Sequence, residues 1–99
     1  MAEIILSYQA KTDLDNIYEY IFQDSPLYAQ RQVEKIFNRL NRISNSIQTG
    51  RIIPELNIES IREVFEGNYR IIYRIISTNK VEVVPILHTA RFFDKDSIL

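Results

Sequence analysis

The chain has 99 residues, of which 45% are hydrophobic, and its 12 basic side chains nearly balance its 13 acidic ones. This length supports one domain over residues 1–99, and the apolar fraction excludes a disordered chain. The formal net charge of −1 argues against a protein that mainly coats nucleic acid. Because the chain has no cysteine and one histidine, disulfides, thiolate metal sites and multi-histidine metal clusters are excluded. We expect no cofactor and no metal.

The N-terminal residues carry no targeting signal. Residues 1–7 lack a basic region, and their apolar run is too short for a signal peptide. No stretch approaches the ~20 apolar residues of a membrane span. We therefore expect a soluble, cytoplasmic protein that does not bind membranes.

The first half of the chain predicts a strand followed by a helical hairpin. Residues 3–7 form a short apolar run that is typical of a strand. Ser7 is a plausible N-cap for a first helix, and Ser25 followed by Pro26 is a good start for a second. Apolar residues recur every three or four positions in the first helix, at Ala10, Leu14, Ile17, Tyr18, Ile21 and Phe22.

The second helix has the clearest periodicity. It would run for about 22 residues, and Gly50 stands where a glycine commonly ends a helix. With the short connection between them, the two helices form an αα-hairpin. The apolar stripe consists of Ala29, Val33, Ile36, Phe37, Leu40, Ile43 and Ile47.

The second half predicts three strands after a connecting segment at residues 51–59. In the middle strand, Arg70 and Arg74 share one face because side chains alternate. Pro85 lies inside the last strand and predicts an edge strand or a bulge. The strand-like runs are 60–66, 69–76 and 81–88, with Gly67-Asn68 and residues 77–80 as turns.

The predicted order is therefore β-α-α-β-β-β. Helices that are segregated from a small meander make an α+β domain. We expect the N-terminal strand and the helical hairpin to pack on a small, mostly antiparallel sheet.

Arginine outnumbers lysine by eight to four, and its fork of donors suits phosphate or carboxylate groups. One interpretation is that Arg62 and Arg70 form ordinary cross-strand ion pairs with glutamates. The other is a basic cluster on one sheet face, including Arg74, that grips a partner or a phosphodiester. The possible glutamate partners are Glu63, Glu66 and Glu82.

His88 is the only histidine and is the natural candidate for acid–base chemistry near neutral pH. The alternative is a structural histidine that donates one hydrogen bond at a strand end. Among the aromatic residues, Phe37, Phe65, Tyr69 and Tyr73 fall on predicted buried faces. Tyrosine is enriched at interfaces, and the tyrosines around the first helix are candidates to line a partner groove: Tyr8, Tyr18, Tyr20 and Tyr28.

Four stretches, in order, span nearly the whole chain and together form a familiar pattern. They are S-x-x-A-x-x-D-L-x-x-I-x-x-Y-I over Ser7–Ile21, then Ser25-Pro26-x-x-Ala29, then Gly50-Arg51-x-x-Pro54-Glu55 with Ile61-Arg62-Glu63, and finally Tyr69-Arg70-Ile71-Ile72-Tyr73 with Ile86-Leu87-His88-x-x-Arg91. The ordered set resembles the RelE/ParE superfamily of bacterial type II toxin–antitoxin toxins, and most of all its ParE branch. The fold of that family agrees with the predicted order of elements.

The resemblance implies a protein of a plasmid-stabilisation module with one of three roles. ParE-like toxins are not enzymes; they inhibit DNA gyrase, block replication and arrest growth. RelE-like toxins are endoribonucleases that cleave mRNA on the ribosome, and this chemistry needs a base, cationic groups and an acid. The third alternative is an inactive homologue that acts as an antitoxin-binding co-regulator. If the chain is a ribonuclease, the candidate catalytic residues are Arg62, Arg70, His88 and Arg91.

Three features favour the ParE-like alternative, with DNA gyrase as the target and no catalytic residues. Where RelE-like proteins carry lysines before the hairpin, this chain has Arg62, Glu63 and Glu66. Its C-terminal residues include Phe92 and Phe93 but no tyrosine. Its near-neutral charge is also poorly suited to an enzyme that docks on the ribosome.

Either branch implies a cognate antitoxin. By resemblance, the antitoxin has a DNA-binding domain and a C-terminal segment that wraps the toxin, so the toxin reaches DNA only through it. The candidate partner-binding residues are Tyr18, Tyr28, Arg51, Arg74 and Arg91.

Overall fold

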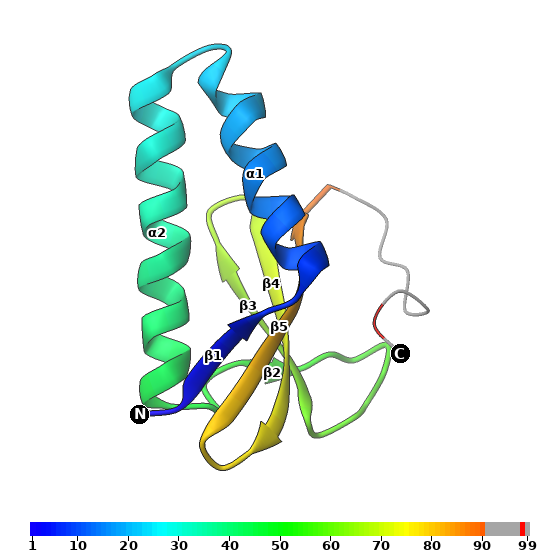
Figure 1. Ribbon diagram of the computed structural model, residues 1–99. Coiled ribbons are helices and arrows are strands. Elements are labelled where there is room, and N and C mark those ends of the chain that lie inside the picture. Colours follow the sequence, from blue (N-terminus) through cyan, green and yellow to red (C-terminus); the bar gives the residue numbers. More distant parts are fainter. Residues whose placement is uncertain (91–97, 99) are drawn as a thin grey trace.

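The described part of the chain folds into a five-stranded sheet and a helical hairpin (Figure 1). The computed structural model describes residues 1–90 and 98, so the candidate Arg91 lies outside the described residues. The elements are β1 (Glu3–Leu6), α1 (Tyr8–Phe22), α2 (Pro26–Asn45), β2 (Arg51–Ile52), β3 (Ile61–Glu66), β4 (Tyr69–Ser77) and β5 (Lys80–His88).

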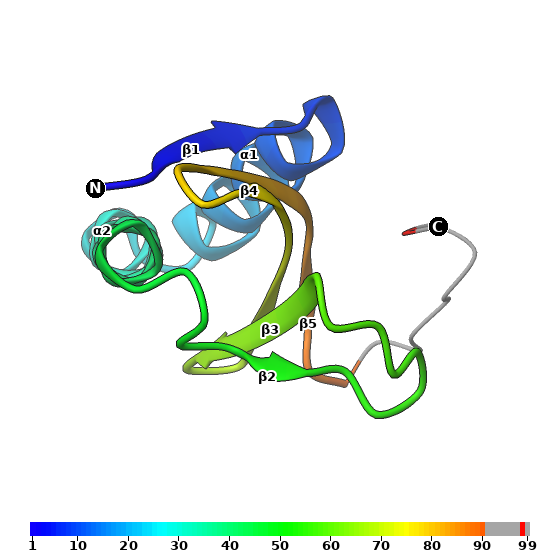
Figure 2. The same ribbon diagram turned by 90° about the horizontal axis from the view of Figure 1, so that it is seen from below.

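The strand order is β1-β5-β4-β3-β2, in which β1 pairs with β5 in parallel and the other pairs are antiparallel. Both helices lie on one side of the curved sheet (Figure 2). The predicted α+β fold is therefore confirmed. The structure adds the short strand β2 inside the segment that we expected to be only a connection. None of the helices in the described part of the chain is long and apolar enough to cross a membrane.

Local side-chain caps start both helices. The Ser7 hydroxyl accepts a hydrogen bond from the Ala10 N–H at 3.0 Å, and the Ser25 hydroxyl accepts one from the Tyr28 N–H at 3.2 Å. These bonds satisfy N–H groups that have no partner in the first turn of a helix. Both predicted N-caps are confirmed.

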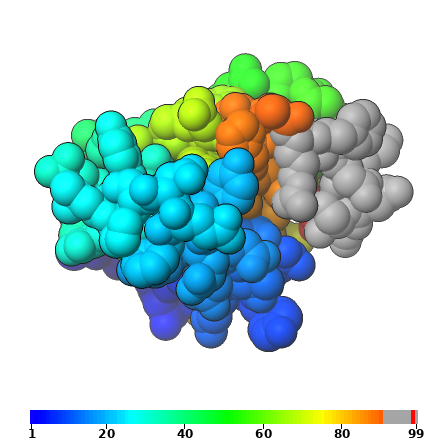
Figure 3. All heavy atoms as spheres, turned by 90° about the horizontal axis from the view of Figure 1, so that it is seen from above, coloured from blue at the N-terminus to red at the C-terminus, as the bar shows by residue number. Residues whose placement is uncertain are grey.

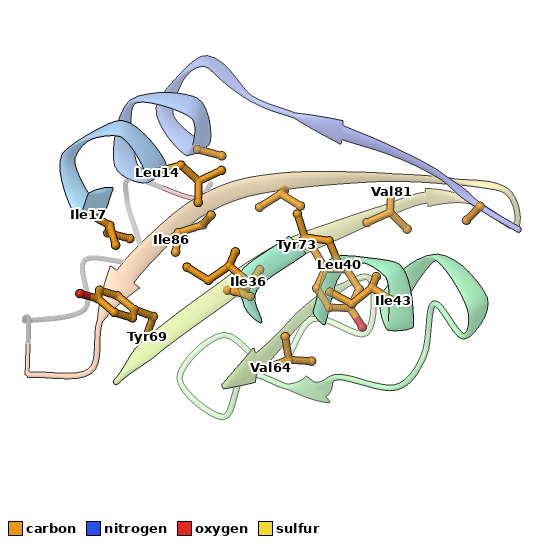
Figure 4. Packing of buried hydrophobic residues seen from close by; sticks show 14 residues of the cluster. Leu14, Ile17, Ile36, Leu40, Ile43, Val64, Tyr69, Tyr73, Val81 and Ile86 are labelled. Atoms are coloured by element: carbon orange, nitrogen blue, oxygen red, sulfur yellow. The ribbon is translucent and has the colours of Figure 1, made fainter. Parts of the chain in front are cut away.

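The main core lies between the hairpin and the side of the sheet that we call the helix face (Figure 4). The alternation predicted for β4 places Tyr69, Ile71 and Tyr73 on this face. The opposite side, the loop face, carries a smaller cluster where the segment after β2 packs on the sheet. The buried residues of that cluster are Ile53, Ile61, Ile72 and Ile98.

Two aromatic residues that we predicted to be buried are exposed. Phe37 is 45% exposed, because it follows the core residue Ile36 on α2 and projects towards the outside of the hairpin. Phe65 is 43% exposed, because β2 pairs only with residues 62 and 63 of β3 and leaves this part of the strand at the sheet edge.

The prediction for Gly50 was also wrong. Helix α2 ends at Asn45, and Ser46 is its C-cap. A Cβ at Gly50 would lie 2.7 Å from the Tyr73 hydroxyl oxygen and 2.8 Å from the Glu63 carbonyl oxygen. The glycine is therefore required by the close approach of the chain to β3 and β4, and not by a helix end.

Pro85 lies in a bulge and not in an edge strand. Strand β5 lies between β1 and β4. Its register with β4 shifts between the pairs Ile71–Ile86 and Tyr73–Val83, so that Val84 and Pro85 together lie opposite Ile72. Proline has no N–H to donate, and a bulge tolerates this loss.

Candidate functional site

A buried carboxylate organises the arginines of the loop face. The Glu63 side chain is 0% exposed. Its Oε2 atom accepts a hydrogen bond from Arg51 Nε at 2.6 Å, and its Oε1 atom accepts one from Arg70 Nε at 2.9 Å and another from Arg70 Nη2. Since the Arg70 side chain is only 13% exposed, its charge and that of Glu63 compensate each other inside the protein.

Phe65 and Glu55 complete this arginine–glutamate cluster, which consists of Arg51, Glu55, Glu63, Phe65 and Arg70. The guanidinium carbons of Arg51 and Arg70 lie 5.7 and 5.8 Å from the Phe65 ring centre, within cation–π range. A Glu55 carboxylate oxygen lies 3.9 Å from Arg70 Nη2. Arg51, Phe65 and Glu55 are therefore exposed to solvent at the surface of the cluster, and Glu63 is buried beneath them.

The structure does not bring Arg62 into this cluster. Arg62 pairs with Tyr73, a residue of the helix face, so the two side chains share that face. Its guanidinium donates to backbone carbonyl oxygens of Glu59 at 2.7 Å and Gly50 at 3.1 Å. The expected ion pair with a glutamate is therefore replaced by bonds to the backbone.

Arg74 lies on the loop face with Arg70, as the alternation of β4 predicts. Arg74 Nη1 is 3.2 Å from a Glu82 carboxylate oxygen, and Nη2 donates to the Ile98 carbonyl oxygen at 2.7 Å. Both partners of this ion pair are partly exposed. Cross-strand pairing with glutamate thus describes Arg70 and Arg74.

His88 lies at the end of β5 on the helix face. It pairs with Tyr69 across the strands, and the two rings meet edge to face at 5.4 Å. Its Nδ1 atom accepts the Ala90 N–H at 3.0 Å, so it does not donate this bond as we expected of a structural histidine. Because Arg70 follows Tyr69 in β4, its side chain lies on the opposite face of the sheet from His88.

A groove runs between α1 and α2 on the outside of the hairpin. This hairpin groove has a volume of about 350 Å³. Tyr18, a predicted partner-binding residue, lines it and also packs against Phe22 with ring centres 5.6 Å apart. Tyr28 is exposed at the start of α2 and does not line it. The lining residues are Leu6, Lys11, Leu14, Asp15, Tyr18, Val33 and Phe37.

The sequence analysis missed Val33 and Phe37 as groove residues, because we assigned them to the core stripe of α2. The available signal was their spacing. They are four residues apart and offset by one position from Ile36 and Leu40, so they lie on the flank of the stripe.

The chain is similar to known proteins in both sequence and fold. Residues 4–93 match the family described as the ParE toxin of the type II toxin–antitoxin system parDE. The chain belongs to the ParE toxin family. Toxin RelE2 of Caulobacter vibrioides is 30% identical over 91 residues, covering 92% of this chain and 99% of the relative.

Two solved structures share the fold of this ParE-family toxin. The chromosomal ParDE system of P. aeruginosa has a TM-score of 0.69 at 19% identity, covering 89% of this chain and 96% of the other. The toxin–antitoxin complex RelBE2 of Mycobacterium tuberculosis has a TM-score of 0.59 at 20% identity, covering 88% and 96%. The chain is therefore a type II toxin of the ParE/RelE superfamily, as its motifs predicted.

Proposed function

We propose that this toxin inhibits DNA gyrase without cleaving RNA, and that a cognate antitoxin neutralises it. The observation that carries the proposal is the position of Glu63. Cleavage of RNA at a 2′-hydroxyl needs a base, a cation for the phosphate and an acid around one bond. Arg70, which matches a functional arginine of the RelE branch, instead directs its guanidinium at a buried carboxylate.

The competition for Arg70 supports this proposal. A phosphate that bound Arg70 would draw it from Glu63, which has no exposed surface on its side chain. Leaving a buried carboxylate with less compensation is costly. His88 is also on the opposite face of the sheet, so Arg70 and His88 do not converge on one phosphodiester.

The decisive experiment measures supercoiling by purified DNA gyrase in the presence of the purified toxin. We expect supercoiling to fall as toxin approaches the gyrase concentration, and mRNA in stalled ribosomes to stay intact in a parallel assay. Toxin that has first been mixed with its antitoxin is the control and should leave supercoiling unchanged. Cleavage of mRNA in the ribosomal A site without gyrase inhibition would refute the proposal.

The second candidate is a ribosome-dependent ribonuclease. Two observations favour it: the relative named RelE2, and the exposed Glu55 carboxylate 3.9 Å from Arg70, which pairs an acid–base group with a cation. In this case His88→Ala should abolish A-site cleavage while circular dichroism shows an intact fold. Arg70→Ala should also abolish cleavage, but its stability must be measured as well because Arg70 compensates the buried Glu63. A chain that neither arrests growth nor has either activity would instead fit a co-regulator that only binds the antitoxin.

We also propose that the antitoxin lays an apolar segment in the hairpin groove. The walls of the groove are largely apolar, and its rim carries the charges of Lys11 and Asp15. Apolar cores with polar rims are typical of protein interfaces. The structural relatives belong to toxin–antitoxin systems, which supports an antitoxin as the occupant.

A further inference from the structure

A second cavity lies on a different face of α1 from the hairpin groove. This α1–β5 cavity has a volume of about 440 Å³. Four of its lining residues are three or four positions apart on α1 and so share one side of the helix. The space-filling view from above shows the end of β5 beside α1 (Figure 3). The lining residues are Asp13, Asn16, Ile17 and Tyr20 of α1, Tyr69 of β4, and Ile86 and His88 of β5.

A buried carboxylate borders the cavity. Asp13 is only 6% exposed. Its Oδ1 atom accepts a hydrogen bond from Gln9 Nε2 at 2.8 Å, and its Oδ2 atom accepts the Ile86 N–H at 2.9 Å. A carboxylate has about four acceptor positions, so both oxygens retain capacity for a ligand that donates hydrogen bonds.

The other walls are aromatic. The His88 ring has Nδ1 as an acceptor for the Ala90 N–H, which leaves its ring proton on Nε2. Tyr69 packs against this ring, and burial together with the nearby Tyr20 raises the pKa of the Tyr69 phenol. The Tyr69 phenol therefore stays uncharged at neutral pH. The faces of such rings attract cations.

The charge of the lining residues favours a cationic ligand. Among the described lining residues, Asp13 is the only acidic one, and no lysine or arginine joins it. A phosphate-bearing ligand would be repelled, whereas a cation would gain a charged partner in a partly desolvated site. Ile17 and Ile86 are buried at its base, and the exposed ring of Tyr20 offers apolar surface for the hydrocarbon stem of a long basic side chain.

We propose that the α1–β5 cavity binds the guanidinium or ammonium group of a basic side chain on a partner polypeptide. Asp13 supplies the counter-charge, Tyr20 and Tyr69 supply aromatic walls, and the exposed Tyr20 ring also packs against the stem. This inference goes beyond the proposed function, because neither gyrase inhibition nor the hairpin groove requires this site.

The test is a nuclear magnetic resonance titration of the full chain with Nα-acetyl-L-arginine methylamide. We expect saturable shifts of the Ile86 amide and the His88 ring, similar shifts with the lysine analogue, and none with the norleucine analogue. Asp13→Asn should weaken binding of the arginine probe by about tenfold. Glu19→Gln removes one exposed charge from the same helix outside the cavity, and binding should be unchanged.

A second variant protects the test from a folding defect. Asp13→Asn keeps an oxygen for the Ile86 N–H but can disturb the adjacent bulge, whereas Tyr20 is exposed and Tyr20→Leu removes only one aromatic wall. Tyr20→Leu should also weaken binding. Equal binding of the norleucine analogue, tighter binding of adenosine, or no saturable shift with the arginine probe would overturn the proposal. Tighter binding of free L-arginine would overturn the assignment to a polypeptide side chain.

Discussion

At the scale of single residues, Glu63 has the largest consequences. Its carboxylate is buried, and its charge is compensated by Arg51 on one oxygen and by Arg70 on the other. Removing one partner of a buried ion pair leaves an undercompensated charge in a medium that solvates it poorly. Arg70 is therefore a structural residue whatever else it does.

We expect Arg70→Ala to lower the free energy of unfolding by about 2–4 kcal/mol, because Arg51 would compensate Glu63 only in part. Urea denaturation followed by circular dichroism measures this loss. Arg74→Ala is the matched control on the same strand, and since its pair with Glu82 is partly exposed it should cost about 1 kcal/mol or less. Equal losses of unfolding free energy in the two variants would show that the buried ion pair contributes no more to stability than the exposed one.

This prediction affects how toxicity assays are interpreted. If Arg70→Ala destabilises the fold, its loss of toxicity is no evidence for catalysis. Arg70→Lys retains the positive charge beside Glu63 but not the fork of donors. A role of Arg70 in a reaction therefore requires loss of activity in a variant whose stability is shown to be sufficient.

The buried phenol of Tyr73 should make the stability of the protein depend on pH in the alkaline range. Burial raises the pKa of its phenol above the ordinary value of 10.0, and the pKa of Tyr69 is raised for the same reason. The folded state therefore holds these protons more tightly than the unfolded state. The resulting stability is complete below pH 10 and is lost as pH rises through the higher folded-state pKa.

Unfolding free energies measured at increasing pH from about 8 should fall above pH 10. Tyr73→Phe should flatten this fall. It should also cost about 1–2 kcal/mol at pH 8, because the hydroxyl donates to the Ile47 carbonyl oxygen and accepts the Gly50 N–H. Tyr8→Phe at an exposed position is the control. A pH profile of Tyr73→Phe that is parallel to that of the natural protein would contradict the assignment.

At the scale of elements, helix starts are determined locally and can be compared with each other. Ser7 and Ser25 have the same capping role, but the Ser7 hydroxyl also donates to the Val84 carbonyl oxygen at 2.6 Å. Val84 belongs to the β5 bulge. Ser7 therefore joins α1 to the sheet as well as starting the helix.

We expect Ser7→Ala to cost about 2 kcal/mol of unfolding free energy and Ser25→Ala about 1 kcal/mol. Ser25→Ala removes only a helix cap in an exposed turn, whereas Ser7→Ala removes a helix cap and also the hydrogen bond to the sheet. Thermal or urea unfolding of both variants measures it. A cost for Ser25→Ala as large as that for Ser7→Ala would show that the bond to Val84 adds nothing.

The bulge shows why strand details were harder to predict than helix starts. Pro85 signalled an irregularity, but the choice between an edge and a bulge depends on which strands flank β5. The Ile86 N–H next to it is satisfied by Asp13, which is 73 positions away in the chain. No pattern within a few residues contains that partner.

At the scale of the whole molecule, the hairpin leaves an outer surface that its own sheet does not cover. Phe37→Ala should weaken antitoxin binding by tenfold or more, as expected when a large apolar side chain is truncated in an interface, at roughly 1.4 kcal/mol per factor of ten. Titration calorimetry with the cognate antitoxin measures this. Asn38→Ala changes the neighbouring exposed residue, which does not line the groove, and should leave binding unchanged. Equal affinities of the antitoxin for the two variants would contradict binding of the antitoxin in the hairpin groove.

Patterns in the sequence were enough to predict the N-terminal strand, the two helices and their caps, the three strands of the meander, the alternation of β4 and the family. These features depend on neighbours within a few residues or on an ordered set of motifs. The three-dimensional fold was needed to show that Glu63 lies beneath Arg51 and Arg70, that Arg62 and His88 are on the other face, and that Gly50 allows a close approach to Tyr73. The reason is physical: a shift of one residue in strand register moves every side chain to the opposite face, and register is set by long-range packing.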